Sequence, residues 1–174
     1  AYHGWEYSDQ GQCIRIPSVP PEHPIPKKAC LTTYKAQERY EIIWVCLSKT
    51  PRTPIPDLPT LEETSYKTIV CDHIHWKCSA ARAVENFLDL AHLPWVHEGI
   101  LGTRDNALVS NVISERDRGH LTFQFDTPPD SIHTIPHKRI HEVYRPFTAT
   151  VRRLEPNGRG EFLLFTCTPH SAKE

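Results

Sequence analysis

The sequence predicts an α+β protein in which one helix is followed by a run of antiparallel strands. Two observations lead to this prediction. Apolar residues recur at helical spacing between residues 79 and 92. Beyond residue 100, short stretches of strand-forming residues alternate with turn residues. A helix followed by several strands in this order is typical of an α+β architecture.

Length and composition indicate a globular chain. The 174 residues suit one domain, or one domain with part of another, and 39% hydrophobic with 24% charged residues is ordinary for a folded protein. The net charge of −1 gives no electrostatic reason to expect a nucleic acid or an acidic membrane as a partner. The chain has no apolar run long enough to span a membrane, and its cysteine usage favours a reducing cytoplasm over a disulfide framework.

The N-terminal region, residues 1–59, is rich in proline and is predicted to form one unit. Residues 2–7 and 12–16 are expected to be short strands joined by a turn at Gly11, and residues 40–47 to be a third strand. Several prolines follow and indicate a linker. We therefore expect a domain boundary between residues 59 and 60.

The second unit, residues 60–174, should contain the helix and most of the strands. A strand is predicted over residues 66–77 and a helix over residues 79–92, with Ser79 as its N-cap. The Asn157-Gly158 pair predicts a hairpin turn between the last two strands. The remaining strand-like stretches are residues 107–114, 121–125, 140–154 and 161–168.

The densest group of possible metal ligands lies at the end of the predicted helix. Asn86, Asp89 and His92 follow one another at intervals of three, which places them near one stripe of a helix. His97 would point elsewhere on a straight helix, but Pro94 favours a break that lets it fold back. Two imidazoles and a carboxylate are the donor set of mononuclear iron(II) sites with open coordination positions.

Spacing alone leaves other interpretations open. The same residues suit a hydrogen-bonded polar cluster at a helix end, and they do not separate iron from zinc. A zinc hydrolase using Asp89, His92 and His97 would have only Glu98 nearby as a general base. A ligand-binding module without metal is a further alternative.

The pattern Asn86-x2-Asp89-x2-His92-x4-His97 resembles the mononuclear iron motif in the large subunit of Rieske-type non-haem iron oxygenases. The resemblance implies that His92 and His97 bind the iron. It also implies that Asp89 holds a ligand histidine and is the bridge for electrons from the Rieske centre of a neighbouring subunit. Asn86 would line the site.

A second motif points to the same family. Residues 2–5, Tyr-His-Gly-Trp, resemble the second half of the Rieske cluster motif, which makes His3 a remnant ligand of a [2Fe–2S] centre. The cysteine of this motif would fall just before Ala1. The third ligand of the mononuclear iron, an aspartate in this family, would lie further downstream than the chain reaches. We therefore expect a chain truncated at both ends that cannot hold the cluster, binds metal weakly or not at all, and is inactive alone.

For the intact parent, the resemblance implies two domains, the tail of a Rieske β domain and a helix-grip domain with a curved antiparallel sheet around a helix. It implies mononuclear Fe(II) and a [2Fe–2S] centre as cofactors, a reductase or ferredoxin as electron donor, and a homotrimer. The expected reaction is the O₂-dependent hydroxylation or oxidative demethylation of a small organic, often aromatic, substrate. Aromatic and aliphatic residues expected in the core or the pocket are Leu121, Phe123, Phe125, Phe147 and Phe162. Structural roles without further function are expected for the histidines at 73, 75, 120, 133, 137 and 141.

Overall fold

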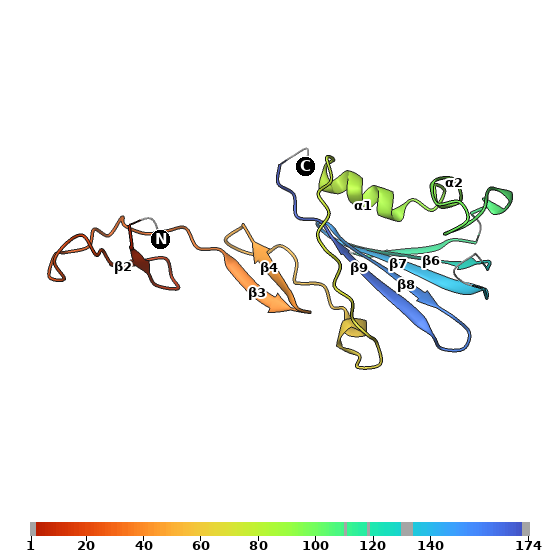
Figure 1. Ribbon diagram of the computed structural model, residues 1–174, viewed down its shortest axis with the longest axis horizontal. Helices are drawn as coiled ribbons and strands as arrows, with labels where there is room; N and C mark the ends of the chain where they lie inside the picture. Colours follow the sequence, from red (N-terminus) through yellow and green to blue (C-terminus); the bar gives the residue numbers. More distant parts are fainter. Residues whose placement is uncertain (1–2, 110, 118, 130–133, 172–174) are drawn as a thin grey trace. The chain divides into compact units, whose positions relative to one another are not determined.

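The computed structural model describes residues 3–109, 111–117, 119–129 and 134–171, and it divides into two compact units, Ala1–Asp57 and Leu58–Glu174 (Figure 1). Two expectations, concerning Tyr2 and His133, lie outside the described residues. The assignment of the first unit to a Rieske domain and of the second unit to a catalytic domain stays a prediction. Among the described residues, no helix is both long and apolar enough to span a membrane.

The first unit consists of two short antiparallel ribbons. Strand β1 (Glu6–Tyr7) pairs with β2 (Cys13–Arg15), which confirms the predicted hairpin. Gly11 lies in the connecting turn with φ +77°, and a Cβ there would stand 2.5 Å from the Leu31 carbonyl oxygen, so only glycine fits.

Strand β3 (Lys35–Arg39) pairs with β4 (Ile42–Cys46) in the second ribbon. The strand predicted over residues 40–47 therefore starts too early. Tyr40 and Glu41 adopt positive φ values of 59° and 58° and form the two-residue turn. A two-residue hairpin turn of type I′ requires positive φ at both central positions, and the residue types gave no sign of it because this turn usually contains Gly, Asn or Asp.

The second unit begins with the short 3₁₀ helix η1 (Pro59–Glu62), and an irregular segment follows. The strand predicted over residues 66–77 is wrong. Its apolar side chains remain open to solvent, with Ile69 75% and Val70 80% exposed. A strand requires a hydrogen-bonded neighbour, and the part of the chain that the structure describes offers this segment none.

Helix α1 (Ala80–Leu88) confirms the predicted start, because the Ser79 hydroxyl accepts a hydrogen bond from the Arg82 N–H at 3.3 Å. Ala83 and Val84 are buried and give the helix its apolar face. The helix ends at Leu88, four residues earlier than predicted, where Asp89 turns extended. The short helices α2 (Leu93–Val96) and η2 (Arg104–Asn106) follow.

A five-stranded antiparallel sheet in sequence order completes the second unit. Its strands are β5 (Ile113–Asp117), β6 (His120–Thr127), β7 (His137–Tyr144), β8 (Thr148–Leu154) and β9 (Gly160–Thr166). The predictions for β6, β9 and the turn at Asn157-Gly158 are confirmed, whereas the strand expected over residues 107–114 lies further along the chain, at β5.

The single strand predicted over residues 140–154 is also wrong, because this stretch folds into the β7–β8 hairpin. Pro146 has no N–H with which to join a strand ladder, and the Arg145 N–H donates to the Gly119 carbonyl at the neighbouring turn. The chain therefore reverses at residues 145–147.

Helices α1 and α2 lie over one face of the sheet, here called the inner face (Figure 1). Phe123, His141, Val151 and Leu163 stand side by side on it, since they are register partners across β6 to β9. The Phe87 ring of α1 stacks on the Phe165 ring of this face, with centroids 4.7 Å apart and planes 9° from parallel. Of the aromatic residues expected in the core or pocket, Phe123 and Phe125 lie on the inner face, and Phe162 alternates to the opposite one.

Candidate functional site

The candidate ligands lie on two short helical pieces joined by a bend. Because α1 ends at Leu88, Asp89 and His92 are outside it, and the expectation that they share a helical stripe with Asn86 is wrong. Pro94 lies in the first turn of α2 and does not end a helix. Proline suits a first turn, where its missing N–H would have no helical acceptor.

This bend brings the two histidines together. His92 directly precedes α2 and His97 directly follows it, and their ring centroids are 5.3 Å apart with the rings at 66°. Both side chains are partly buried. The proximity expected from the sequence is therefore present, but its cause is a one-turn helix between the histidines.

Asp89 stands behind His92 and is held in place by the backbone. Its Oδ1 accepts a hydrogen bond from the Ala91 N–H at 2.9 Å, and its Oδ2 lies 3.5 Å from Nδ1 of His92. This distance is short enough for an ion pair but too long for a good hydrogen bond. The buried Nδ1 of His92 therefore has no hydrogen-bond partner. A carboxylate facing Nδ1 leaves Nε2 of His92 as the nitrogen that can bind a metal.

The donor set fits an iron site in part. Two neighbouring imidazoles suit iron(II), but among the residues that the structure describes no group of three or more His, Cys, Asp and Glu side chains is placed to hold a metal. Glu98, the general base that a zinc hydrolase would need, forms an ion pair with Arg104 at 2.9 Å.

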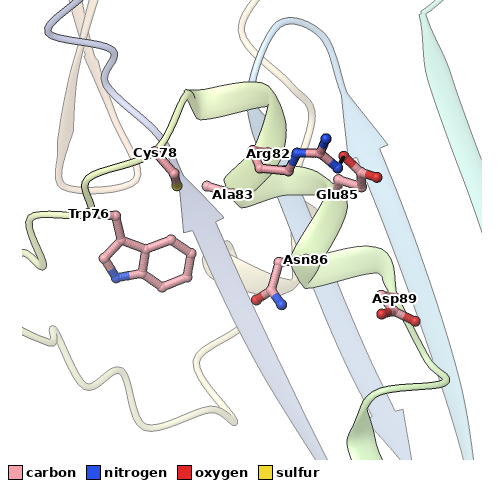
Figure 2. A pocket seen from close by; sticks show the side chains of 7 residues that line it. All are labelled: Trp76, Cys78, Arg82, Ala83, Glu85, Asn86 and Asp89. Carbon is pink, nitrogen blue, oxygen red and sulfur yellow. Dashed lines mark hydrogen bonds and ion pairs between the residues drawn. The ribbon is translucent and has the colours of Figure 1, made fainter. Parts of the chain in front are cut away.

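A hollow of about 540 Å³ lies beside α1 and is lined at one end by Asp89 (Figure 2). Figure 2 shows Arg82 and Glu85 directed toward one another, and they form an ion pair at 2.6 Å. The residues that line the hollow are Trp76, Cys78, Arg82, Ala83, Glu85, Asn86 and Asp89. Asn86 and Asp89 therefore face a common space, and His92 and His97 are outside its lining.

His3, the expected cluster ligand, lies in the first unit ahead of β1. Within the described ranges, no set of three or more metal-binding side chains gathers around it. All six cysteines have free thiols. The described residues thus do not form a [2Fe–2S] site.

Sequence reasoning missed a row of nitrogen-rich side chains on β7. His137, Arg139 and His141 alternate along the strand, share the inner face, and are 3%, 7% and 4% exposed. The Arg139 Nε–H donates to Nε2 of His137 at 3.2 Å. The alternation H-x-R-x-H was a visible signal, but only the observed sheet shows that this face is covered.

His141 differs from the rest of the row because neither of its ring nitrogens has a hydrogen-bond partner. Burial, assisted by the positive charge of Arg139, lowers the pKa of His141 to about 4. The imidazole is therefore neutral near pH 7, with one N–H donor and one acceptor nitrogen.

Comparisons with known proteins agree on one family. Residues 76–153 match the family model "Vanillate O-demethylase oxygenase C-terminal domain". The chain is 35% identical over 130 residues to methylxanthine N1-demethylase NdmA of Pseudomonas putida, a match that covers 74% of this chain and 37% of that protein. It is 31% identical over 118 residues to TsaM1 of Comamonas testosteroni, the iron-sulfur subunit of the toluene-4-sulfonate monooxygenase system; that match covers 67% of this chain and 33% of the relative.

The solved structures give the same result. The NdmA QL mutant of Pseudomonas putida CBB5 with caffeine superimposes with a TM-score of 0.84 at 28% sequence identity. The match covers 97% of this chain and 48% of that one. The chain thus spans about half the length of its solved neighbour.

Proposed function

This chain belongs to the large subunits of Rieske-type non-haem iron oxygenases, and on that premise we propose that it contributes the two histidine ligands of the family's mononuclear iron site. The observation that carries this proposal is the pairing of the His92 and His97 rings at 5.3 Å, with Asp89 behind His92. The proposed reaction of the whole protein is the O₂-dependent hydroxylation or oxidative demethylation of an aromatic compound.

Each residue of the cluster has a separate proposed task. His92 and His97 would hold iron(II), which when bound supplies the activation of O₂. Asp89 orients the His92 imidazole and would be the bridge toward the electron-delivering centre of a neighbouring copy. Asn86, on the last turn of α1 beside the hollow, would line the approach to the site.

The proposed substrate class follows from the relatives' names. One relative is named a demethylase of methylxanthine and another belongs to a monooxygenase system for toluene-4-sulfonate, and both compounds are aromatic. A reductase or ferredoxin as electron donor, a homotrimer and a [2Fe–2S] centre are proposed for the whole protein. Because the described residues form no cluster site, the cluster is not assigned to this chain.

The proposal can be tested on the natural full-length polypeptide that carries this sequence. Supplied with a reductase, ferredoxin and O₂, it should release formaldehyde from caffeine or vanillate, or oxidise toluene-4-sulfonate. The substitutions His92→Ala and His97→Ala should each abolish turnover, because each removes one of two neighbouring donors. Full activity in either variant would contradict the assignment of the ligands.

A further inference from the structure

The inner face of the sheet contains a buried polar group that the proposed iron site does not use. His141 is 4% exposed, lies under α1, and has two ring nitrogens without hydrogen-bond partners. Buried polar atoms in folded proteins almost always find a partner, so an exception calls for a physical reason.

The surroundings of His141 are aromatic. The His141 ring stacks on that of Phe123, with centroids 4.8 Å apart and planes at 19°. The ring of Phe125, which is on β6 like Phe123, has its centroid 5.6 Å from that of His141. Phe87 approaches from α1, with its centroid 6.5 Å from that of His141. Stacked and tilted rings with centroids about 4.5–7 Å apart are the arrangements that aromatic pairs prefer, so the surroundings of His141 suit a flat ring.

Arg139 contributes a positive charge beside His141. The two residues are neighbours on the same face, and the positive charge of Arg139 contributes to the low pKa of His141. The neutral imidazole retains an N–H donor in a water-poor environment, where a hydrogen bond to an oxygen acceptor is strong.

The location connects this residue to the proposed iron site. Phe87, which covers His141, is on the last turn of α1, two residues before Asp89 and five before His92. A molecule held between α1 and His141 would therefore lie along the path of the chain that carries both histidine ligands.

We propose that His141 is a substrate-specificity residue that donates a hydrogen bond to an aromatic compound bearing an oxygen acceptor on its edge, such as a carbonyl or sulfonate oxygen. The compound enters between α1 and the sheet by displacing the Phe87 ring. This inference rests on the proposed function, since it identifies the substrate class of the same site.

The test compares His141→Phe with the wild type in the natural full-length polypeptide. Phenylalanine keeps the flat ring and removes both nitrogens. Calorimetric titration with caffeine and with toluene-4-sulfonate should show binding of at least one compound by the wild type and about tenfold weaker binding by the variant.

Two further variants keep the test decisive. His141→Gln retains a hydrogen-bond donor and should recover part of the affinity. If His141→Phe misfolds, the comparison of His141→Gln with the wild type still tests the role of the donor. His120→Phe alters a histidine on the opposite face, where the ring stacks on Tyr144 at 4.4 Å, and should leave binding unchanged.

Two results would overturn the inference. Equal affinities for the wild type and His141→Phe would show that His141 packs as an aromatic ring without contacting a ligand. A wild-type protein that binds neither caffeine nor toluene-4-sulfonate would refute the substrate class. Both measurements are independent of turnover and of iron content. A negative result would therefore refute this inference without affecting the assignment of His92 and His97 as iron ligands.

Discussion

The helical segment, residues 79–97, and strand β7 each carry a pair of histidines, but the two pairs have opposite surroundings. His92 and His97 lie at the ends of a one-turn helix and are only partly buried. His137 and His141 are on β7 with 3% and 4% exposure. The first pair stays available to a metal, whereas the second is enclosed by neighbouring strands and by α1.

The difference shows how the local backbone decides what a histidine can do. A helix end leaves space around a ring and places a carboxylate such as Asp89 beside it. A covered sheet face removes water, favours the neutral imidazole, and makes each missing hydrogen bond costly by about 1–3 kcal/mol. The two pairs should therefore respond to mutation and pH in different ways.

The largest expected effect concerns pH and His141. The folded pKa of about 4 is below the ordinary histidine pKa of 6.5, so between these values the unfolded chain binds a proton that the folded chain excludes. Stability contributed by the neutral ring is complete above pH 6.5 and is lost as the pH falls toward 4. The loss should reach about 3 kcal/mol, since each pKa unit corresponds to about 1.4 kcal/mol.

Urea unfolding of the full-length wild type and the His141→Phe variant at pH 7 and pH 4.5 measures this loss. The variant should lose less stability than the wild type over that interval, because it has no imidazole to protonate. Other groups, such as Glu155, titrate in both proteins and cancel in the comparison. Equal losses in both proteins would show that His141 is not held neutral by burial.

Asp89→Asn should weaken metal binding by roughly 10–100-fold, the usual effect of changing a group that orients a ligand histidine. The asparagine oxygen can still accept from the Ala91 N–H, so the bend should persist. Glu85→Gln, on the exposed side of α1, is the matched control and should bind metal like the wild type. Titration with Co(II) measures both affinities, and an unchanged affinity in Asp89→Asn would remove Asp89 from the site.

The smallest expected effect concerns the start of α1. Ser79→Ala removes the hydroxyl that caps the helix and should cost about 1 kcal/mol of unfolding free energy. Ser65→Ala, in an exposed turn, should cost almost nothing. If the two variants have the same urea midpoint, the cap does not contribute to stability.

The features predicted correctly depend on signals from a few adjacent residues. Ser79 as a cap, Gly11 in a turn and Asn157-Gly158 in a hairpin all follow from the chemistry of one or two side chains. The histidine pair was found by its motif. The family was recognised for the same reason, since both motifs are short and local.

The features predicted wrongly depend on partners elsewhere in the chain. Residues 66–77 have strand-like composition but no neighbouring strand, and the β7–β8 reversal depends on where Arg145 donates its N–H. The early end of α1 at Leu88 changes the geometry of Asp89 and His92 without any strong helix-breaking residue there. The burial of His141 requires both β6 and Phe87, which no local pattern reveals.

The central claim is that His92 and His97 are the iron ligands, and a second histidine pair provides a matched control. His75 and His170 also pair their rings, with centroids 5.4 Å apart compared with 5.3 Å for His92 and His97. The direct measurement is iron content after anaerobic reconstitution of the full-length polypeptide, with cluster absorbance recorded in parallel. The double variant His92→Ala/His97→Ala should lose the mononuclear iron and keep the cluster absorbance, while His75→Ala/His170→Ala should keep both. Mononuclear iron retained without His92 and His97 would contradict the account.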